Sequence, residues 1–176
     1  MPKPWAGTAC RKQYRQEIIR QTDVYAAWIA EKEQKDISGK QVTGGPLITV
    51  VPFFCYREWK QSYTNIQYIG KDTDILDFAS MDGEYVAFVN GEGNLEEDAL
   101  TIVSDYLNHD LIYSDEDGLR MTDGARTAPF FKPDLSPDTL SSFFYFENFF
   151  VVKRSAVLQM AIQENGNDID RLYDFV

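Results

Sequence analysis

The sequence predicts an α/β domain with a mostly parallel β-sheet flanked by helices, preceded by an N-terminal helical extension. Three observations predict this class. Residues 47–54 form a continuous β-branched and aromatic run, which is typical of a strand buried on both faces of a parallel sheet. Strand-like and helix-like segments alternate after this run, and an amphipathic stripe precedes it. We therefore expect residues 1–45 to form the extension and residues 46–176 to form the domain.

Length and composition allow one such domain. The chain has 176 residues, of which 44% are hydrophobic, and its formal net charge is -11. This composition is globular, and the negative charge argues against nucleic acid as a partner. The apolar stretches are too short or too interrupted for a transmembrane segment, and the N-terminus lacks a signal-peptide pattern, so we expect a cytoplasmic protein, free or peripheral to the membrane. Cys10, Cys55 and the single His109 suggest neither a disulfide framework nor a zinc site.

The N-terminal helix is expected over residues 11–34. An apolar stripe recurs there at three- and four-residue steps, at Tyr14, Ile18, Tyr25 and Ile29. We expect this face to pack against the domain or a second copy, because an exposed stripe of that length would promote association. Gly44, Gly45 and Pro46 then end the pattern.

Four further strands are predicted after the first one. Apolar segments indicate them at residues 66–69, 85–89, 111–113 and 149–153. We expect the strands at 47–54, 85–89 and 111–113 to be central neighbours covered by helices, because strands so poor in polar residues need cover on both faces. The aromatic cluster over residues 143–150 fits core packing better than an acceptor groove.

Three helices are predicted from their caps. Asn94 with Glu97 three residues later has the spacing of a capping box. Ser136, Pro137 and Asp138 give a cap, a first-turn proline and an acid that suits the helix dipole. Ser155 is expected to cap a last helix that runs through residue 161.

An acidic segment at residues 114–118 directly follows the strand at 111–113. In open α/β sheets ligands bind at the carboxyl ends of strands, and Glu92 follows its strand in the same way. Glu92, Asp115 and Asp117 could therefore share a cation, whereas the simpler interpretation of the segment is a solvated acidic loop.

Basic residues follow the acidic segment at Arg120, Arg126 and Lys132. They could contact phosphate oxygens of a ligand. Equally, they could be exposed cations that balance Asp115 and Asp117.

Three segments, in this order and spacing, resemble the bacterial family 2 glycosyltransferases that build surface polysaccharides, rhamnosyltransferase-like members included. They are PLITVVP at residues 46–52, DLIYSDED at 110–117 and FKPDLSPD at 131–138. The resemblance implies a Rossmann-like fold of the GT-A type, and sugar transfer from a nucleotide-sugar donor to a glycan acceptor. It also implies Mn²⁺ or Mg²⁺, which carboxylates hold against the departing pyrophosphate.

The sequence departs from the family at the positions that carry the chemistry. The nucleoside-binding Asp-Asp pair is reduced to Asp72, preceded by Lys71, and the metal-binding Asp-x-Asp is reduced to Glu92. The position of the catalytic base is Leu172, which leaves Asp174 as a candidate catalytic carboxylate. We expect Asp72, Lys132 and Arg126 to contact the donor. The segments after Cys55 and after Asp74 are also shorter than in the family.

Three interpretations stay open. The chain could be a metal-dependent glycosyltransferase of low activity, because loss of a positioned base costs about 10²–10⁴-fold in rate. It could be an inactive glycosyltransferase-like module that binds a neighbouring domain or a second copy. It could also be one piece of a longer polysaccharide-synthesis protein, in which case the missing groups could come from elsewhere.

Overall fold

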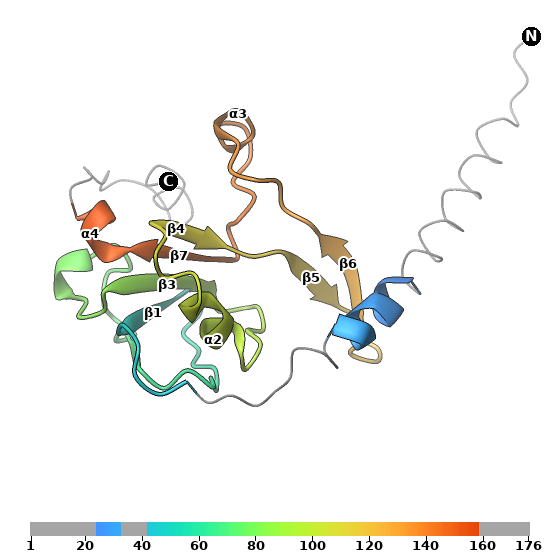
Figure 1. The fold of residues 1–176 in the computed structure, drawn as a ribbon, viewed down its shortest axis with the longest axis horizontal. Coiled ribbons are helices and arrows are strands. Elements are labelled where there is room, and N and C mark those ends of the chain that lie inside the picture. The colour runs from blue at the N-terminus through green and yellow to red at the C-terminus, as the bar shows by residue number, and fades with distance from the viewer. Residues whose placement is uncertain (1–23, 33–41, 159–176) are drawn as a thin grey trace, which may run out of the picture. The chain divides into compact units, whose positions relative to one another are not determined.

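The computed structural model describes residues 24–32 and 42–158 (Figure 1). These residues form two compact units, a smaller one of residues 24–32 with 115–131, and a larger one of residues 42–114 with 132–158. Most of the predicted N-terminal helix, the end of the last predicted helix, Leu172 and Asp174 lie outside the described residues. Within the described ranges, no helix is long and apolar enough to span a membrane.

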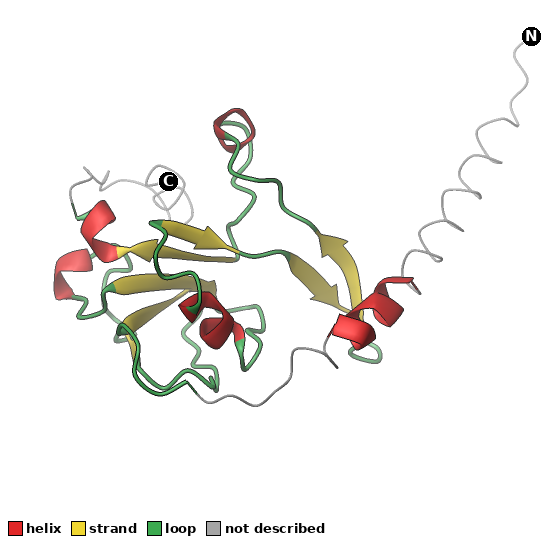
Figure 2. Cartoon of the chain, viewed as in Figure 1, coloured by secondary structure: helices red, strands yellow, loops and turns green. Residues whose placement is uncertain are grey.

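A mixed five-stranded sheet forms the centre of the larger unit (Figure 2). The strand order is β2-β1-β3-β7-β4. The strands are β1 (Ile48–Phe53), β2 (Ile66–Tyr68), β3 (Tyr85–Asn90), β4 (Leu111–Tyr113) and β7 (Phe149–Lys153). β1 pairs in parallel with β2 and β3, whereas β7 runs antiparallel to both β3 and β4. The predicted α/β class with a largely parallel sheet is therefore confirmed.

The predicted neighbour order is wrong for one strand. β7 lies between β3 and β4, so the strand at Leu111–Tyr113 is at the edge of the sheet. The burial of the strands gives the reason. β7 is buried at four of its five positions, whereas all three residues of β4 are half-buried. The more apolar strand takes the interior position, which removes more apolar surface from water.

Aromatic side chains fill one part of the core. Phe88 of β3 stacks on Phe150 of β7 with ring centroids 4.8 Å apart, and Phe144 and Phe146 pack edge-on against Phe150. Phe150 is fully buried, whereas Phe143 is 51% exposed. The aromatic cluster therefore packs in the core, as predicted, except for its first ring.

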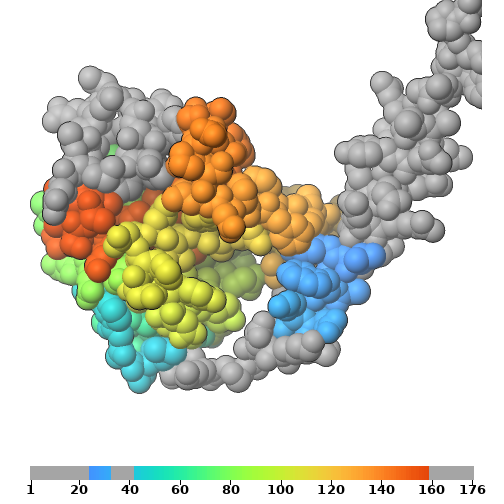
Figure 3. Space-filling model, turned by 45° about the horizontal axis from the view of Figure 1, so that its top comes forward, coloured from blue at the N-terminus to red at the C-terminus, as the bar shows by residue number. Residues whose placement is uncertain are grey.

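The helices are few and short. They are α2 (Ala99–Ser104), α3 (Pro137–Leu140) and α4 (Arg154–Val157), with the 3₁₀ turn η1 (Phe78–Ser80). α3 projects on the surface of the larger unit and buries no residue (Figure 3). Its predicted cap is confirmed, because the Ser136 hydroxyl accepts a hydrogen bond from the Thr139 amide and Pro137 occupies the first turn.

The other two predicted caps are wrong. α2 begins after Asp98, and the Asn94 side chain instead accepts a hydrogen bond from Arg57 at 3.5 Å. Glu97 forms an ion pair with Lys60 at 2.7 Å. α4 begins at Arg154, so Ser155 lies inside the helix. In each case a tertiary partner or the preceding strand, and not the local pattern, sets the start of the helix.

The smaller unit contains an antiparallel hairpin of β5 (Glu116–Leu119) and β6 (Arg126–Phe130) and the helical residues 24–32. The acidic segment is thus partly a strand and not wholly a solvated loop. An isolated two-stranded hairpin is marginally stable in water and needs cover. Here the rings of Tyr25 and Trp28 contact Phe131 with centroids 6.3 and 6.2 Å away, so the helical residues cover the end of the hairpin.

Candidate functional site

The order of the parallel strands identifies the edge of the sheet at which a ligand is expected to bind. From β1 the chain continues to β2 on one side, and then returns to place β3 on the other side of β1. This reversal of strand order is a topological switch point, where the connections leave the sheet in opposite directions and open a crevice. Ligands of open α/β sheets bind outside the strand ends at such a point.

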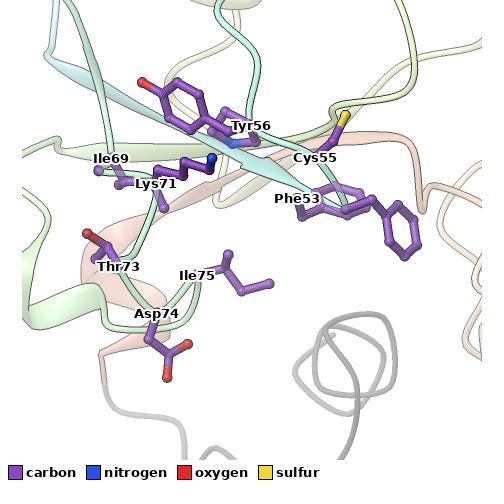
Figure 4. A pocket seen from close by; sticks show the side chains of 11 residues that line it. Phe53, Cys55, Tyr56, Ile69, Lys71, Thr73, Asp74 and Ile75 are labelled. Atoms are coloured by element: carbon purple, nitrogen blue, oxygen red, sulfur yellow. The ribbon is translucent and has the colours of Figure 1, made fainter.

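A cleft of about 650 Å³ lies at this edge, beyond the ends of β1 and β2 (Figure 4). Phe53, Ile69 and Ile75 are buried and give it an apolar floor. The remaining lining residues are Pro52, Phe54, Cys55, Tyr56, Gly70, Lys71, Thr73 and Asp74. The volume of the cleft falls within the range of small-molecule sites. Such sites also combine an apolar lining with a few polar groups, as this cleft does.

The loop after β1 packs directly on the turn after β3. The Gly91 amide donates a hydrogen bond to the Phe53 carbonyl at 2.9 Å, and a Cβ added at Gly91 would lie 1.8 Å from the Cys55 carbonyl oxygen. Phe54 adopts a positive φ of 63°, which is uncommon for a residue with a bulky side chain. The missing side chain at Gly91 therefore allows the two strand ends to approach closely.

Arg57 ties the same two segments together. Its Nη1 donates to the Gly93 carbonyl at 2.8 Å, and its guanidinium lies 5.6 Å from the centre of the Trp59 ring. Trp59 is buried, so the cation is positioned by a fixed aromatic surface. The sequence pattern gave no indication of this role, because Arg57 and Gly93 are brought together only by the pairing of β1 with β3.

The turn after β3 uses its own polar groups to hold its shape. The Asn90 side-chain oxygen accepts a hydrogen bond from the Glu92 amide, and its NH₂ group donates to the Asn148 side chain, both at 2.9 Å. Asn90 stands at the first acidic position of the family motif. Its amide is thus engaged within the protein, and Glu92 is the one carboxylate of this turn.

The loop after β2 contains the predicted donor residue Asp72. The Thr73 amide closes a turn by donating to the Gly70 carbonyl at 3.0 Å, and Asp72 is exposed on this turn. Lys71 lines the cleft, whereas Asp72 is not among the lining residues. Lys132, another predicted donor contact, is half-buried on the segment that leads to α3.

Asp117 and Arg126 form an ion pair within the smaller unit. Arg126 Nε lies 2.6 Å from Asp117 Oδ2, and the Tyr25 hydroxyl donates to the same oxygen at 2.6 Å. Burial, followed by the hydrogen bond to Asp117, raises the pKa of Tyr25 from 10.0 to about 12. Asp117, predicted as a metal ligand, and Arg126, predicted as a donor contact, therefore bind each other.

Replacement of Tyr25 by Phe should weaken the smaller unit. A hydrogen bond to a charged group contributes about 1.5–3 kcal/mol, so loss of the hydroxyl should increase amide hydrogen exchange in β5 and β6. The pKa of Tyr25 is higher in the folded than in the unfolded protein. The contribution of its hydroxyl group to stability is therefore fully present below pH 10 and is lost as the pH rises towards about 12. Tyr106→Phe, at an exposed position, should leave exchange unchanged. Equal exchange in the two variants would contradict this contact.

The predicted metal ligands divide between the two units. Glu92 belongs to the larger unit, and Asp115 and Asp117 belong to the smaller one, so their common site stays a prediction. Among the described residues, no group of three or more His, Cys, Asp or Glu side chains could hold a metal ion. Asp117 is bound to Arg126 and the Asn90 amide is held in its turn, so each would have to leave its present partner to bind a divalent cation.

Part of the chain is similar to a curated protein. The chain is 42% identical over 95 residues to the O-antigen biosynthesis protein RfbC of Myxococcus xanthus. The match covers 52% of this chain and 7% of that protein, so the chain corresponds to a small part of its relative. No protein-family model and no solved structure matches the chain.

Proposed function

We propose that the chain is a family 2 glycosyltransferase-like domain that binds a nucleotide-sugar donor during surface polysaccharide synthesis. The observation that carries the proposal is the cleft at the switch point of the sheet, with Lys71 on its rim. The name of the RfbC relative supports polysaccharide synthesis, and the family resemblance supports a nucleotide-sugar as the ligand.

The cleft offers complementary surfaces for the parts of such a donor. The apolar floor of Phe53, Ile69 and Ile75 suits a flat nucleobase, and the Lys71 ammonium group suits its phosphates. Asp72 lies on the same turn, at the position of the family's nucleoside-binding pair. Lys132 is a further proposed phosphate contact, whereas Arg126 would first have to leave Asp117.

A second candidate function is a donor-binding module without transferase activity. The observation that favours it is the engagement of the Asn90 amide and of Asp117 by other protein groups. In the enzyme, Asp174 is the proposed catalytic carboxylate, with Glu92, Asp115 and Asp117 as the proposed ligands of Mn²⁺ or Mg²⁺. A glycan acceptor is then the second substrate.

Calorimetric titration of the full chain with UDP-, GDP- and dTDP-sugars tests the proposal. We expect saturable binding of at least one donor. Thr73→Trp, which places a large ring on the rim of the cleft, should abolish binding, and Thr122→Trp on the exposed surface of the smaller unit should not.

Two results would count against donor binding in this cleft. The first is no detectable binding of any donor, and the second is unchanged binding by the Thr73→Trp variant. Where binding is present, an assay of nucleotide release with a sugar acceptor separates the two candidates, because rates near about 1 s⁻¹ are typical of enzymes and the module would show none.

A further inference from the structure

We infer that the cleft binds the diphosphate of its ligand through the Lys71 ammonium group and without a divalent cation. This inference rests on the proposed function and concerns the same cleft. It replaces the metal implied by the family with a side chain of the protein.

Lys71 is the one cationic side chain among the eleven residues that line the cleft. Figure 4 shows it extending from the loop after β2 towards the end of β1, where Cys55 and Tyr56 lie. Within the part of the chain that the structure describes, Lys71 forms no ion pair. Its ammonium group can therefore bind an anion in the cleft without breaking a salt bridge.

The acids around the cleft have protein partners. An Asp74 carboxylate oxygen accepts a hydrogen bond from the Leu76 amide at 3.0 Å. Glu58 accepts a hydrogen bond from the Tyr56 hydroxyl, and this bond is the main cause that raises the Tyr56 pKa. Asp72, beside Lys71, is exposed to water, which screens its charge. Lys71 is thus the one positive charge that a ligand meets among the lining residues, and Asp74 is the one acid there.

The two sequence departures from the family both make the edge of the sheet less negative. An acid is replaced by Lys71 in the loop after β2, and an acid is replaced by Asn90 in the turn after β3. The edge of the sheet therefore gains a cationic side chain at Lys71, and at Asn90 it loses a carboxylate that could bind a metal ion. A lysine ammonium group neutralises phosphate oxygens as a point charge with three donors, which is the electrostatic role that a divalent ion would fill.

Because the whole chain is negatively charged, its affinity for an anionic ligand depends on the contact with Lys71. At a formal net charge of -11, the protein repels a nucleoside diphosphate at long range. Affinity for such an anion must then come from groups inside the cleft. Because the Lys71 side chain is exposed, this contact should weaken as ionic strength rises.

Titration of UDP, GDP and dTDP into the full chain, first with EDTA and then with Mn²⁺, tests the inference. We expect at least one of these nucleotides to bind in EDTA. Lys71→Met should weaken that binding by about 10-fold or more, as expected for loss of a charge-assisted contact. The same variant should leave the affinity for the matching nucleoside unchanged, because the nucleoside carries no phosphate.

Two further variants serve as controls. Lys60→Met removes an exposed lysine of the same unit that is paired with Glu97, and should bind like the wild type. Lys71→Arg keeps the charge and should retain most of the affinity.

The outcomes separate this inference from the proposed function. Binding that requires Mn²⁺, or binding in EDTA that Lys71→Met leaves unchanged, would overturn the inference and leave donor binding intact. No binding under either condition would overturn the proposed function together with the inference.

Discussion

Gly91→Ala should destabilise the larger unit by about 3 kcal/mol or more. A Cβ at this position would lie 1.8 Å from the Cys55 carbonyl oxygen and 2.8 Å from its carbon. These are backbone atoms that cannot rotate away, so the loop after β1 and the turn after β3 would have to separate. Overpacking in a rigid site costs about 1–3 kcal/mol and sometimes more, and a domain has only about 5–15 kcal/mol in total.

Urea unfolding followed by circular dichroism measures this effect. Gly93→Ala in the same turn is the matched control, because its Cβ would come no closer than 3.3 Å to a neighbouring atom, the Asn90 oxygen. We expect a much smaller change for the control. Similar midpoints for Gly91→Ala and the wild type would show that the two strand ends are not in contact.

Phe150→Ala should cost about 3–5 kcal/mol, the usual range for a buried Phe. Phe150 is fully buried, and its ring packs against Phe88, Phe144 and Phe146 at centroid distances between 4.8 and 5.8 Å. Truncation would leave a cavity between β3 and β7 that rigid aromatic neighbours cannot fill. The aromatic cluster thus stabilises the strand whose position was not predicted.

The same unfolding experiment includes Phe143→Ala as its control. Phe143 belongs to the same cluster in sequence but is 51% exposed, so its loss should change stability by no more than about 0.5 kcal/mol. Equal effects of the two substitutions would contradict the burial of Phe150 and the insertion of β7 beside β3.

The strands were predictable because burial on both faces leaves a local signal. The apolar runs of β1, β3 and β7 each identified a strand within a residue or two of its bounds. Their order was not predictable, since the insertion of β7 between β3 and β4 depends on which strand buries more surface. That comparison requires the assembled sheet.

Elements that depend on distant partners were missed. Glu116–Leu119 has the composition of a loop, yet it pairs with β6, and Arg126 neutralises Asp117 across the hairpin. Asn94 has the spacing of a helix cap, yet it binds Arg57. In both cases a cation from another segment changed the outcome that the local sequence favoured.

The candidate site was partly predictable for the same reasons. The rule that ligands bind at the carboxyl edge of strands led to the loops that carry Asp72 and Glu92. The roles of Gly91 and Arg57 were not visible, because each depends on contact between the end of β1 and the turn after β3. Lys71 counted only as a departure from the family until the structure placed it in the cleft.

The central claim is that the cleft at the ends of β1 and β2 is the donor site. Amide chemical-shift mapping by NMR, with the nucleotide-sugar that binds best, tests this claim most directly. The account predicts that the largest shifts fall in residues 53–56 and 69–75, with smaller shifts in the turn of residues 90–93. Largest shifts within residues 115–131 of the smaller unit, or no shifts at saturating donor, would contradict it.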